Sequence, residues 1–295
     1  MIDRTPPDPT DNSGPFRQRL WTPWRMVYVG GGTKEPGCVF CNRLSSDLDV
    51  NSLIVYRTEL TFIIMNLYPY NTGHVMVVPR AHVQDLAALD PVTLAELADL
   101  GAALTTALRR ILGCDGFNVG MNIGSAAGAG IADHLHQHIV PRWNGDANFM
   151  PIVGSTKVLP ETLPATYAKI RAEFCRERSA STTATVVVFD PDLNTVLLDG
   201  GALPRVMLDP ETAVWRSIVQ SLGPKAANLQ IGGWAGPDET SADDHTAPAV
   251  ACITTGLRPA ATGLHMVNLD REELQLLADT DRRLIATSRD RLGSA

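Results

Sequence analysis

Three histidines alternate along five residues of this chain, at His134, His136 and His138. Successive side chains of a β-strand point to opposite faces, so residues two apart share one face. We therefore predict a strand over 134–140 that ends before Pro141, with the three imidazoles on one face and Gln137 on the other. Because a dry core disfavours three partly charged rings, the pattern indicates a functional site.

The residues allow two kinds of chemistry for this row of histidines. Pairs of the form His-x-His ligate zinc, and histidine is also one of the side chains that act as covalent nucleophiles. The segment 118–130, just before the row, is rich in Gly, Ala and Ser. Small residues let the backbone approach a ligand closely, and successive N–H groups cradle phosphate. This neighbourhood favours phosphorus chemistry.

Length and composition narrow the class of protein. A chain of 295 residues suggests two domains, and a hydrophobic content of 44% is typical of packed cores. The net charge of -7 argues against a broad nucleic-acid-binding surface. A small anionic ligand remains compatible with that charge, because local N–H groups and a few cations suffice to hold phosphate.

The sequence also contains indications of the cellular compartment in which the protein is found. It contains no apolar run of about 20 residues, the length that a membrane helix needs, and its N-terminus lacks the apolar stretch of a signal peptide. Residues 1–15, rich in Pro and Asp, are predicted to form a disordered tail. The five cysteines are an odd set, which favours a reducing cytoplasm over a disulfide framework.

The pattern of elements predicts a first domain over 16–178 and a second over 180–295. Hydrophobic periodicity and turn residues place strands at 52–56, 60–66, 74–79 and 116–123, a long helix up to 111 that Asp90-Pro91 interrupts, and a closing helix at 160–178. In the second domain they place strands at 185–189, 196–198, 249–255 and 263–268, helices at 211–222 and 270–291, and a polar loop at 235–247.

The segment 134–143 reads His-Leu-His-Gln-His-Ile-Val-Pro-Arg-Trp. It resembles the signature of the histidine-triad superfamily, and the segment 66–79, Asn-Leu-Tyr-Pro-Tyr-Asn-Thr-Gly-His-Val-Met-Val-Val-Pro, is similar to the first half of that family's pattern. The segments Trp-Thr-Pro-Trp-Arg at 21–25 and Gly-Asp-Ala-Asn-Phe-Met at 145–150 resemble the bacterial branch of diadenosine-tetraphosphate phosphorylases and related hydrolases. The resemblance covers about 16–178, slightly over half of the chain.

The resemblance implies an α+β protein, in which a histidine-triad-like domain with an antiparallel sheet and a long helix precedes a smaller α/β sandwich-like domain. It implies that His136 attacks the α-phosphorus of a nucleotide, that His138 contacts the phosphate oxygens, and that His134 orients the nucleophile. A neutral imidazole suits this task near pH 7. The implied nucleotide-binding residues are Asn66, Asn118, Asn122, Gly128, Ala129 and Gly130.

One position departs from the family pattern. Many dinucleoside-polyphosphate hydrolases carry a Gln four residues before the first histidine, whereas this chain has Gly130 there and no Gln elsewhere in the loop. The loop contact to the scissile bridge is therefore missing or replaced, with Ser125 as the candidate. This departure favours a phosphorylase-like over a hydrolase-like activity.

A metal site is a second expectation. Cys38 and Cys41 have the C-x-x-C spacing of zinc ligands. By resemblance to related superfamily members, His82 and His134 complete a structural Cys₂His₂ zinc site that ties the N-terminal segment to the histidine strand. In the alternative interpretation both cysteines are reduced packing residues and His82 ends a strand.

After residue 180 the order of elements resembles a degenerate Nudix domain. A working Nudix box needs several glutamates on one helix to hold Mg²⁺, whereas the predicted helix 211–222 has only Glu211. We therefore expect this segment to be catalytically silent and to bind a nucleotide, regulate the enzyme or widen a dimer interface.

The implied function is nucleotidyl transfer or hydrolysis on a dinucleoside polyphosphate through a nucleotidyl-histidine intermediate, as in diadenosine-tetraphosphate phosphorylases. A nucleoside phosphoramidate is the alternative substrate, and a nucleotide-binding sensor with weak turnover is the alternative from another class. The chemistry requires no cofactor. By analogy with the family we expect a cytoplasmic homodimer, without a nucleic-acid or membrane partner.

Overall fold

The computed structural model describes residues 35–46, 48–128, 130–146, 161–236, 247–258 and 261–293. The predicted tail at 1–15, the aromatic segment at 21–25, Ala129 and residues 147–150 of the phosphorylase-like motif lie outside these ranges. So do residues 237–246 of the predicted polar loop. The described residues from Thr33–Asp146 and Leu159–Ala295 belong to one compact unit.

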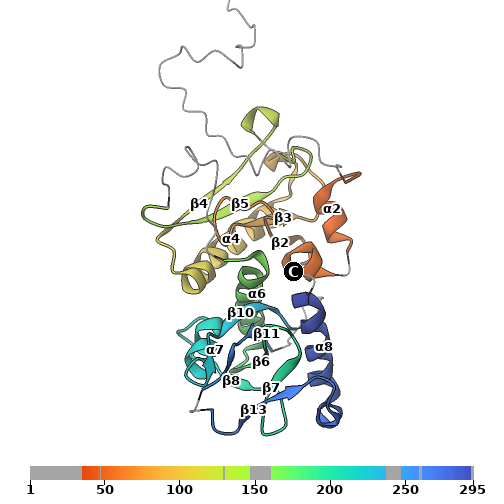
Figure 1. Ribbon diagram of the computed structural model, residues 1–295. Helices are drawn as coiled ribbons and strands as arrows, with labels where there is room; N and C mark the ends of the chain where they lie inside the picture. The colour runs from red at the N-terminus through yellow and green to blue at the C-terminus, as the bar shows by residue number, and fades with distance from the viewer. Residues whose placement is uncertain are drawn as a thin grey trace, which may run out of the picture. The chain divides into compact units, whose positions relative to one another are not determined.

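The first half of the unit is built on a five-stranded antiparallel sheet in the order β1-β2-β3-β5-β4. Its strands are β1 (Ile54–Arg57), β2 (Thr61–Met65), β3 (Val75–Pro79), β4 (Gly116–Met121) and β5 (Gln137–Arg142). Two short helices, α2 (Val39–Leu44) and α3 (Asp49–Ser52), precede the sheet. The expectation of an antiparallel sheet with a long helix is confirmed, and Figure 1 shows that helix, α4, against the sheet.

The long helix α4 (Pro91–Leu112) begins where the sequence predicted an interruption. Asp90 is its N-cap and accepts hydrogen bonds from the N–H groups of Val92 and Thr93, while Pro91 occupies the first turn, where no N–H is needed. Before it lies only a short 3-10 turn, η1 (Leu86–Ala88). Gly113, with a φ of 67°, ends the helix in the left-handed conformation.

The two faces of this sheet carry different layers. One face packs against α4 and includes Val75, Val77 and Ile139. The opposite face packs against Phe40 of α2 and includes Met76 and Val78. Because Met76 pairs with His138 across β3 and β5, the histidines lie on the Phe40 face. Gln137 lies on the α4 face, next to Gly101.

The predicted bounds of the histidine strand are wrong. Pairing begins at Gln137, so His134 and His136 precede β5, in a segment that the hydrogen bond from Leu135 N–H to the Val83 carbonyl (2.7 Å) holds in place. Pro141 lies inside β5. β3 pairs with β5 only as far as Ile139, so Pro141 has a single neighbouring strand in this sheet. A proline is tolerated at such an edge position.

The second half is a six-stranded mixed sheet in the order β10-β11-β6-β7-β13, with β8 also paired to β6. Its strands are β6 (Thr183–Phe189), β7 (Thr195–Asp199), β8 (Arg205–Met207), β10 (Gln230–Trp234), β11 (Ala249–Ile253) and β13 (Leu264–Asn268). A separate two-stranded sheet joins β9 (Ala226–Ala227) to β12 (Gly256–Leu257). Of these, β8, β9, β10 and β12 were missed by the sequence analysis.

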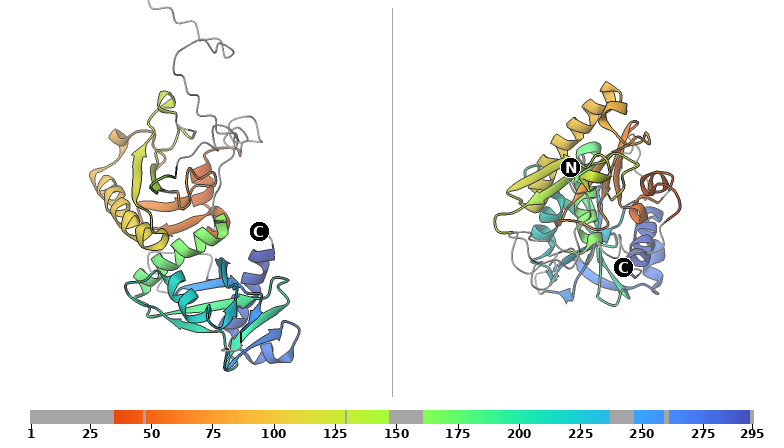
Figure 2. Two further views of the ribbon diagram at one scale, coloured as in Figure 1. Left: turned by 60° about the vertical axis from the view of Figure 1, so that its left-hand side comes forward. Right: turned by 90° about the horizontal axis from the view of Figure 1, so that it is seen from above.

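Helices cover both faces of the six-stranded sheet, as an α/β sandwich requires. On one face lie α6 (Leu163–Ser179) and α7 (Val214–Leu222), and on the other η3 (Glu272–Leu276) and α8 (Asp279–Gly293). Figure 2 shows these layers from two further directions. The predicted helix 270–291 is thus divided into η3 and α8, and the predicted helix 211–222 begins three residues later, so that Glu211 precedes it. A Nudix relationship stays a prediction.

Helix α6 contacts both sheets, since it packs against β1 of the first and against β10 and β11 of the second. Its residues from Ala165 to Arg176 are all buried, including the charged side chains of Arg171 and Glu173. Glu173 accepts hydrogen bonds from Arg110 of α4 (2.9 Å) and from the N–H of Val214 (3.0 Å). The predicted closing helix of the first half is therefore shared with the second.

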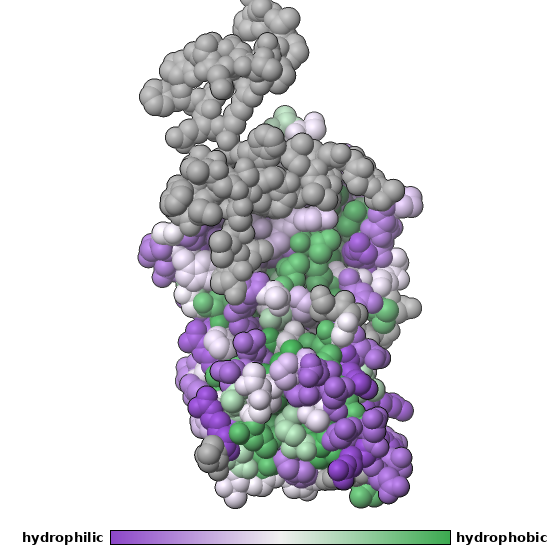
Figure 3. Space-filling view, viewed as in Figure 1, coloured by the Kyte–Doolittle hydropathy of each residue, from purple (hydrophilic) through white to green (hydrophobic). Residues whose placement is uncertain are grey.

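On the face drawn in Figure 3, hydrophobic residues gather in a patch in the upper part, while hydrophilic and hydrophobic residues are interspersed below it. Among the helices within the described ranges, none combines the length and apolarity needed to cross a membrane.

Candidate active site

Two histidines of the predicted row, His134 and His136, lie against the ring of Phe40, and the third, His138, lies next to His136. The ring centroid of Phe40 is 5.4 Å from that of His134 and 5.0 Å from that of His136, and the ring centroids of His136 and His138 are 4.7 Å apart. Phe40 reaches them because α2 covers this face of the sheet. The three imidazoles therefore form one cluster, but each has different hydrogen-bond partners.

The environment of His136 leaves one of its ring nitrogens with a lone pair. Nδ1 lies 2.8 Å from the backbone carbonyl of His134, and because a carbonyl only accepts, Nδ1 carries the proton. Burial lowers the pKa of His136 below its ordinary value, so the neutral ring is favoured. The neutral tautomer then has an unprotonated Nε2, which is the form that a nucleophile needs.

His138 is fixed by a residue that the sequence analysis assigned no role. The fully buried His74 accepts a hydrogen bond from the N–H of Tyr70 at Nδ1 (3.1 Å), and its Nε2 lies 3.0 Å from Nδ1 of His138. Since Nδ1 of His74 accepts, Nε2 of His74 carries the proton and donates it to His138. In the neutral ring of His138 the proton is consequently on Nε2.

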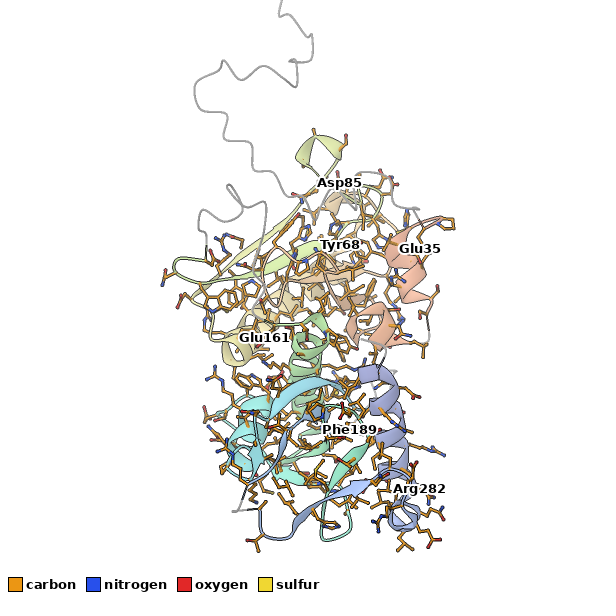
Figure 4. The ribbon with its side chains drawn as sticks, viewed as in Figure 1. Glu35, Tyr68, Asp85, Glu161, Phe189 and Arg282 are labelled. Carbon is orange, nitrogen blue, oxygen red and sulfur yellow. The ribbon has the colours of Figure 1, made fainter. Side chains whose placement is uncertain are left out.

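A signal for His74 was present in the sequence: this histidine directly follows Gly73, the glycine of the turn before β3. Figure 4 labels Tyr68 of the same turn. Gly73 has a φ of 77°, and a methyl group there would meet Leu112 at 2.3 Å, so the turn requires glycine. The ring of Tyr70 stacks on His74 with centroids 4.8 Å apart. The alternation of the three later histidines gave no indication of this fourth ring.

The structure brings the four predicted metal ligands together. The ligand atoms of Cys38, Cys41, His82 and His134 all lie within 4.8 Å of one another. Nδ1 of His134 is 3.3 Å from the Cys38 sulfur and 3.6 Å from the Cys41 sulfur, and Nδ1 of His82 is 3.3 Å from the Cys41 sulfur. Cys38 caps α2 at its N-terminus, and Cys41 follows in the first turn.

His134 has the tautomer that a metal ligand needs. Its Nε2 lies 2.8 Å from the carbonyl of Pro79, which only accepts, so Nε2 carries the proton. Burial lowers the pKa of His134, which favours the neutral ring with an unprotonated Nδ1. That nitrogen is the one that faces both sulfurs.

The asparagines predicted to bind the nucleotide differ in their surroundings. Asn66 makes local bonds, since its Oδ1 accepts from the N–H of Tyr68 (2.9 Å) and its Nδ2 lies 3.3 Å from Nδ1 of His74. Asn118 is exposed on β4, on the same face as His138, and its Oδ1 accepts from Arg142 (2.6 Å). Asn122 directly follows β4, beyond the Met121–Gln137 pair.

In the loop of small residues, 124–128 and Gly130 are exposed, and the loop contains the short turn η2 (Ser125–Ala127). Gly124 and Gly128 have φ values of 76° and 80°, which glycine adopts without strain. Within the described residues, a methyl group at Gly128, or at Gly120 of β4, would meet no atom within 4 Å. Gly120 pairs with His138, so its missing side chain leaves space beside that imidazole.

The sequence of this chain is similar to that of proteins from one known family. Residues 48–145 match the HIT domain family. The AP-4-A phosphorylase of Mycobacterium tuberculosis (strain H37Rv) is 39% identical over 168 residues, which cover 54% of this chain and 86% of that protein. An uncharacterised HIT-like protein of Saccharolobus solfataricus is 30% identical over 113 residues, covering 38% of this chain and 79% of that protein.

Solved structures of the same kind are similar to the first half of the chain. A zinc-bound histidine triad family protein from Mycobacterium smegmatis is 30% identical and covers 49% of this chain and 98% of that chain, with a TM-score of 0.40. A hypothetical histidine triad nucleotide-binding protein from Sulfolobus tokodaii is 31% identical and covers 45% of this chain and 87% of that chain, with a TM-score of 0.36.

Proposed function

This chain belongs to the histidine-triad (HIT) family, and on that basis we propose that it is a nucleotidyltransferase or hydrolase acting on dinucleoside polyphosphates. The observation that carries the proposal is the state of His136, whose Nδ1–H is held by the His134 carbonyl while burial favours the neutral ring. The likeness to an AP-4-A phosphorylase at 39% identity supports a diadenosine polyphosphate as substrate.

The reaction begins with attack by Nε2 of His136 on the α-phosphorus. A nitrogen–phosphorus bond forms and the bond between the α-phosphorus and the bridging oxygen breaks; with diadenosine tetraphosphate the leaving group is ATP. Positive charge then grows on the imidazole, and the His134 carbonyl at Nδ1 is placed to stabilise it. Transfer of the nucleotidyl group from His136 to phosphate yields ADP, and transfer to water yields AMP.

His138 is assigned the contact to the phosphate oxygens. The bond from His74 places the proton of His138 on Nε2, so the ring offers a donor to an anionic group. The space across from it at Gly120, and the exposed residues 124–128 and Gly130 of the loop, support a polyphosphate chain in this position. Asn118 and Asn122 flank the same region as candidates for sugar or phosphate contacts.

We include a structural zinc ion in the proposal, held by Cys38, Cys41, His82 and His134. In a tetrahedral site with bond lengths of about 2.3 Å to sulfur and about 2.05 Å to nitrogen, these two kinds of ligand lie about 3.6 Å apart. The sulfur–nitrogen distances of 3.3 Å to 3.6 Å fit this geometry. The bond from His134 to the Pro79 carbonyl is the kind that orients a ligating histidine. The ion would hold α2 against the segment that precedes β5.

A homodimer remains part of the proposal. β4 is an edge strand of the five-stranded sheet, and its Val119 is 49% exposed. An exposed edge strand offers unpaired backbone groups to a second sheet. Sedimentation of the purified protein gives the oligomeric state directly, and a monomer at all concentrations contradicts this part.

The test of the function is a product assay with diadenosine tetraphosphate, with and without inorganic phosphate. We expect ADP and ATP in the presence of phosphate if the enzyme is a phosphorylase, and AMP and ATP in either condition if it is a hydrolase. Adenosine phosphoramidate is assayed in parallel. If neither substrate turns over while a nucleotide still binds, the protein is a sensor and the proposed enzymatic function is wrong.

A further inference from the structure

The carboxylate of Asp146 connects separate segments beyond the C-terminal end of β5. It accepts a pair of hydrogen bonds from Arg142, from Nε and from Nη2, both at 2.7 Å. It also accepts from the N–H of Trp143 (3.1 Å) and from Nδ2 of Asn71 (2.8 Å). Asn71 is 75 residues away in the chain and belongs to the turn that carries His74. A paired arginine–carboxylate contact is both strong and directional.

Through Asn71, Asp146 reaches the phosphate-contacting histidine. Nδ2 of Asn71 also donates to the carbonyl of Pro141 (3.0 Å), and the carbonyl of Asn71 accepts from the N–H of His74 (3.1 Å). This fixes the backbone of His74 relative to β5. The imidazole of His74 in turn donates to Nδ1 of His138. The turn is therefore anchored at one end by Asp146 and bears the partner of His138 at the other.

Through Arg142, Asp146 reaches a second candidate contact of the nucleotide. Nη1 of Arg142 donates to Oδ1 of Asn118 at 2.6 Å. This bond sets the orientation of the Asn118 amide, with its oxygen toward Arg142. Arg142 and Asn118 lie on the same face of β5 and β4 as His138, because their pairing partners follow the same alternation.

We propose that Asp146 is a positioning residue of this active site, which holds His138 through Asn71 and His74, and Asn118 through Arg142. The roles of His138 and Asn118 toward a substrate rest on the proposed function. The connection from Asp146 to the two residues rests on the hydrogen bonds alone. Asp146 of the bacterial-branch motif at 145–150 thereby gains a physical role.

The test compares Asp146→Asn with a matched control, Asp115→Asn. Asn at position 146 keeps the size of the side chain, but in either orientation its NH₂ group faces a donor: Nη2 of Arg142 at one oxygen position, or Nε of Arg142, the N–H of Trp143 and Nδ2 of Asn71 at the other. Asp115 accepts a hydrogen bond from the N–H of Asn144 (2.7 Å) in the same short segment. Asn at position 115 removes the charge but keeps an acceptor there, so the control makes the same chemical change in that segment without touching Asn71. We expect Asp146→Asn to lower kcat about 10- to 100-fold with KM changed by less than about threefold, and Asp115→Asn to change neither.

A second readout does not depend on activity. The ¹⁵N signals of the histidine ring nitrogens, measured by NMR, report which nitrogen carries the proton. We expect Asp146→Asn to shift the signals of His74 and His138 and to leave those of His136 unchanged. Asn71→Ala removes the bond from Asn71 to Asp146 together with its bond to the Pro141 carbonyl, and leaves the bonds of Arg142 in place. It is expected to shift the same signals and serves if Asp146→Asn does not fold.

Unchanged His138 signals in a folded Asp146→Asn or Asn71→Ala protein overturn the proposal, as does an equal loss of kcat in Asp115→Asn. If the wild type turns over no dinucleoside polyphosphate but the His138 signals still shift, the proposed function fails while the positioning role stands. A lowered melting temperature with unchanged signals and kcat identifies a purely structural role and also contradicts the proposal.

Discussion

At the scale of single residues, the three histidines of the row are chemically distinct because of their hydrogen-bond partners. His134 and His136 both face backbone carbonyls, but with opposite ring nitrogens: Nε2 in His134 and Nδ1 in His136. Each bond therefore leaves a different nitrogen unprotonated: Nδ1 of His134, which faces the cysteines, and Nε2 of His136, for which we propose attack on phosphorus. The alternation predicted that the three rings share one face, whereas their tautomers follow from carbonyls that only the folded backbone supplies.

The first residue-scale prediction concerns the nucleophile. We expect His136→Ala to lower kcat by at least about 10⁴-fold, because the two-step route through a covalent intermediate is lost. The measurement is nucleotide release from diadenosine tetraphosphate. His265→Ala, which changes a histidine of β13 outside the site, is the control and is expected to retain activity. A rate for His136→Ala within about tenfold of the wild type removes His136 as nucleophile.

The second residue-scale prediction concerns pH. Hydrogen bonds from Arg142, and further ones from Trp143 and Asn71, hold the pKa of Asp146 well below the ordinary value of 3.8. Stability that depends on the ionised carboxylate is therefore complete above that ordinary value and is lost as the pH falls below it. We expect the difference in free energy of unfolding between wild type and Asp146→Asn to be constant above about pH 5 and to shrink below about pH 4. Urea unfolding of both proteins across this pH range measures the difference in free energy of unfolding. A difference that grows on acidification contradicts the prediction.

At the scale of elements, α2 links the candidate metal site to the catalytic face. Its first turn presents Cys38 and Cys41, and its Phe40 packs against His134 and His136. The other end of α2 is held by Arg57 of β1, which donates to the carbonyl of Leu44 (2.6 Å) and pairs with the buried Asp49 (2.7 Å). The C-x-x-C spacing predicted ligands but not a helix, because six residues carry little periodicity.

The element-scale prediction is that the protein as purified gently contains about one zinc ion per chain. Cys38→Ser is expected to lose most of this metal and to melt at a lower temperature, because the tie between α2 and the segment before β5 is broken. Metal analysis and thermal unfolding measure the two effects. Cys114→Ala, which changes a buried cysteine outside the cluster, is expected to retain the metal. A metal-free wild type contradicts the zinc proposal.

At the scale of the whole molecule, the two halves share α6. Its buried Arg171 lies over the ring of Trp234 of β10, 5.2 Å from the centroid, and Glu173 bonds to groups from both halves. Trp215 of α7 donates to the carbonyl of Ile111 (2.9 Å) and so satisfies a group at the end of α4. The predicted domain boundary near residue 179 separates the two sheets, but α6, the helix before this boundary, packs against both of them.

The whole-molecule prediction follows from this shared helix. A chain that ends at Ser179 exposes the face of α6 that packs on β10 and β11, so we expect it to be insoluble or to melt at least about 10 °C below the full chain. Trp215→Phe removes one hydrogen bond and is expected to cost only about 1 kcal/mol. Thermal unfolding measures both. If the shortened chain has the stability and turnover of the full protein, the prediction is wrong and the first half folds and acts without the second.

The sequence by itself determined the features that depend on local periodicity. The alternation of His134, His136 and His138, the interruption at Asp90-Pro91 and the long helix after it were readable, because side-chain direction repeats every two residues in a strand and every 3.6 in a helix. Family resemblance added the assignment of His136. The strand bounds were less well predicted, since Pro141 is tolerated only because β3 ends at its pair with Ile139.

Only the tertiary structure decided how the histidines are held. His74 lies 64 residues from His138 and Asn71 lies 75 from Asp146, and no local pattern brings such residues within hydrogen-bond distance. Their contacts depend on the register of β3 against β5 and on the closure of the turn before β3. The same holds for α6, whose sequence predicts a helix but not the two sheets that bury it. A residue's type is local information, whereas its protonation state and partners are set by segments that meet only in the fold.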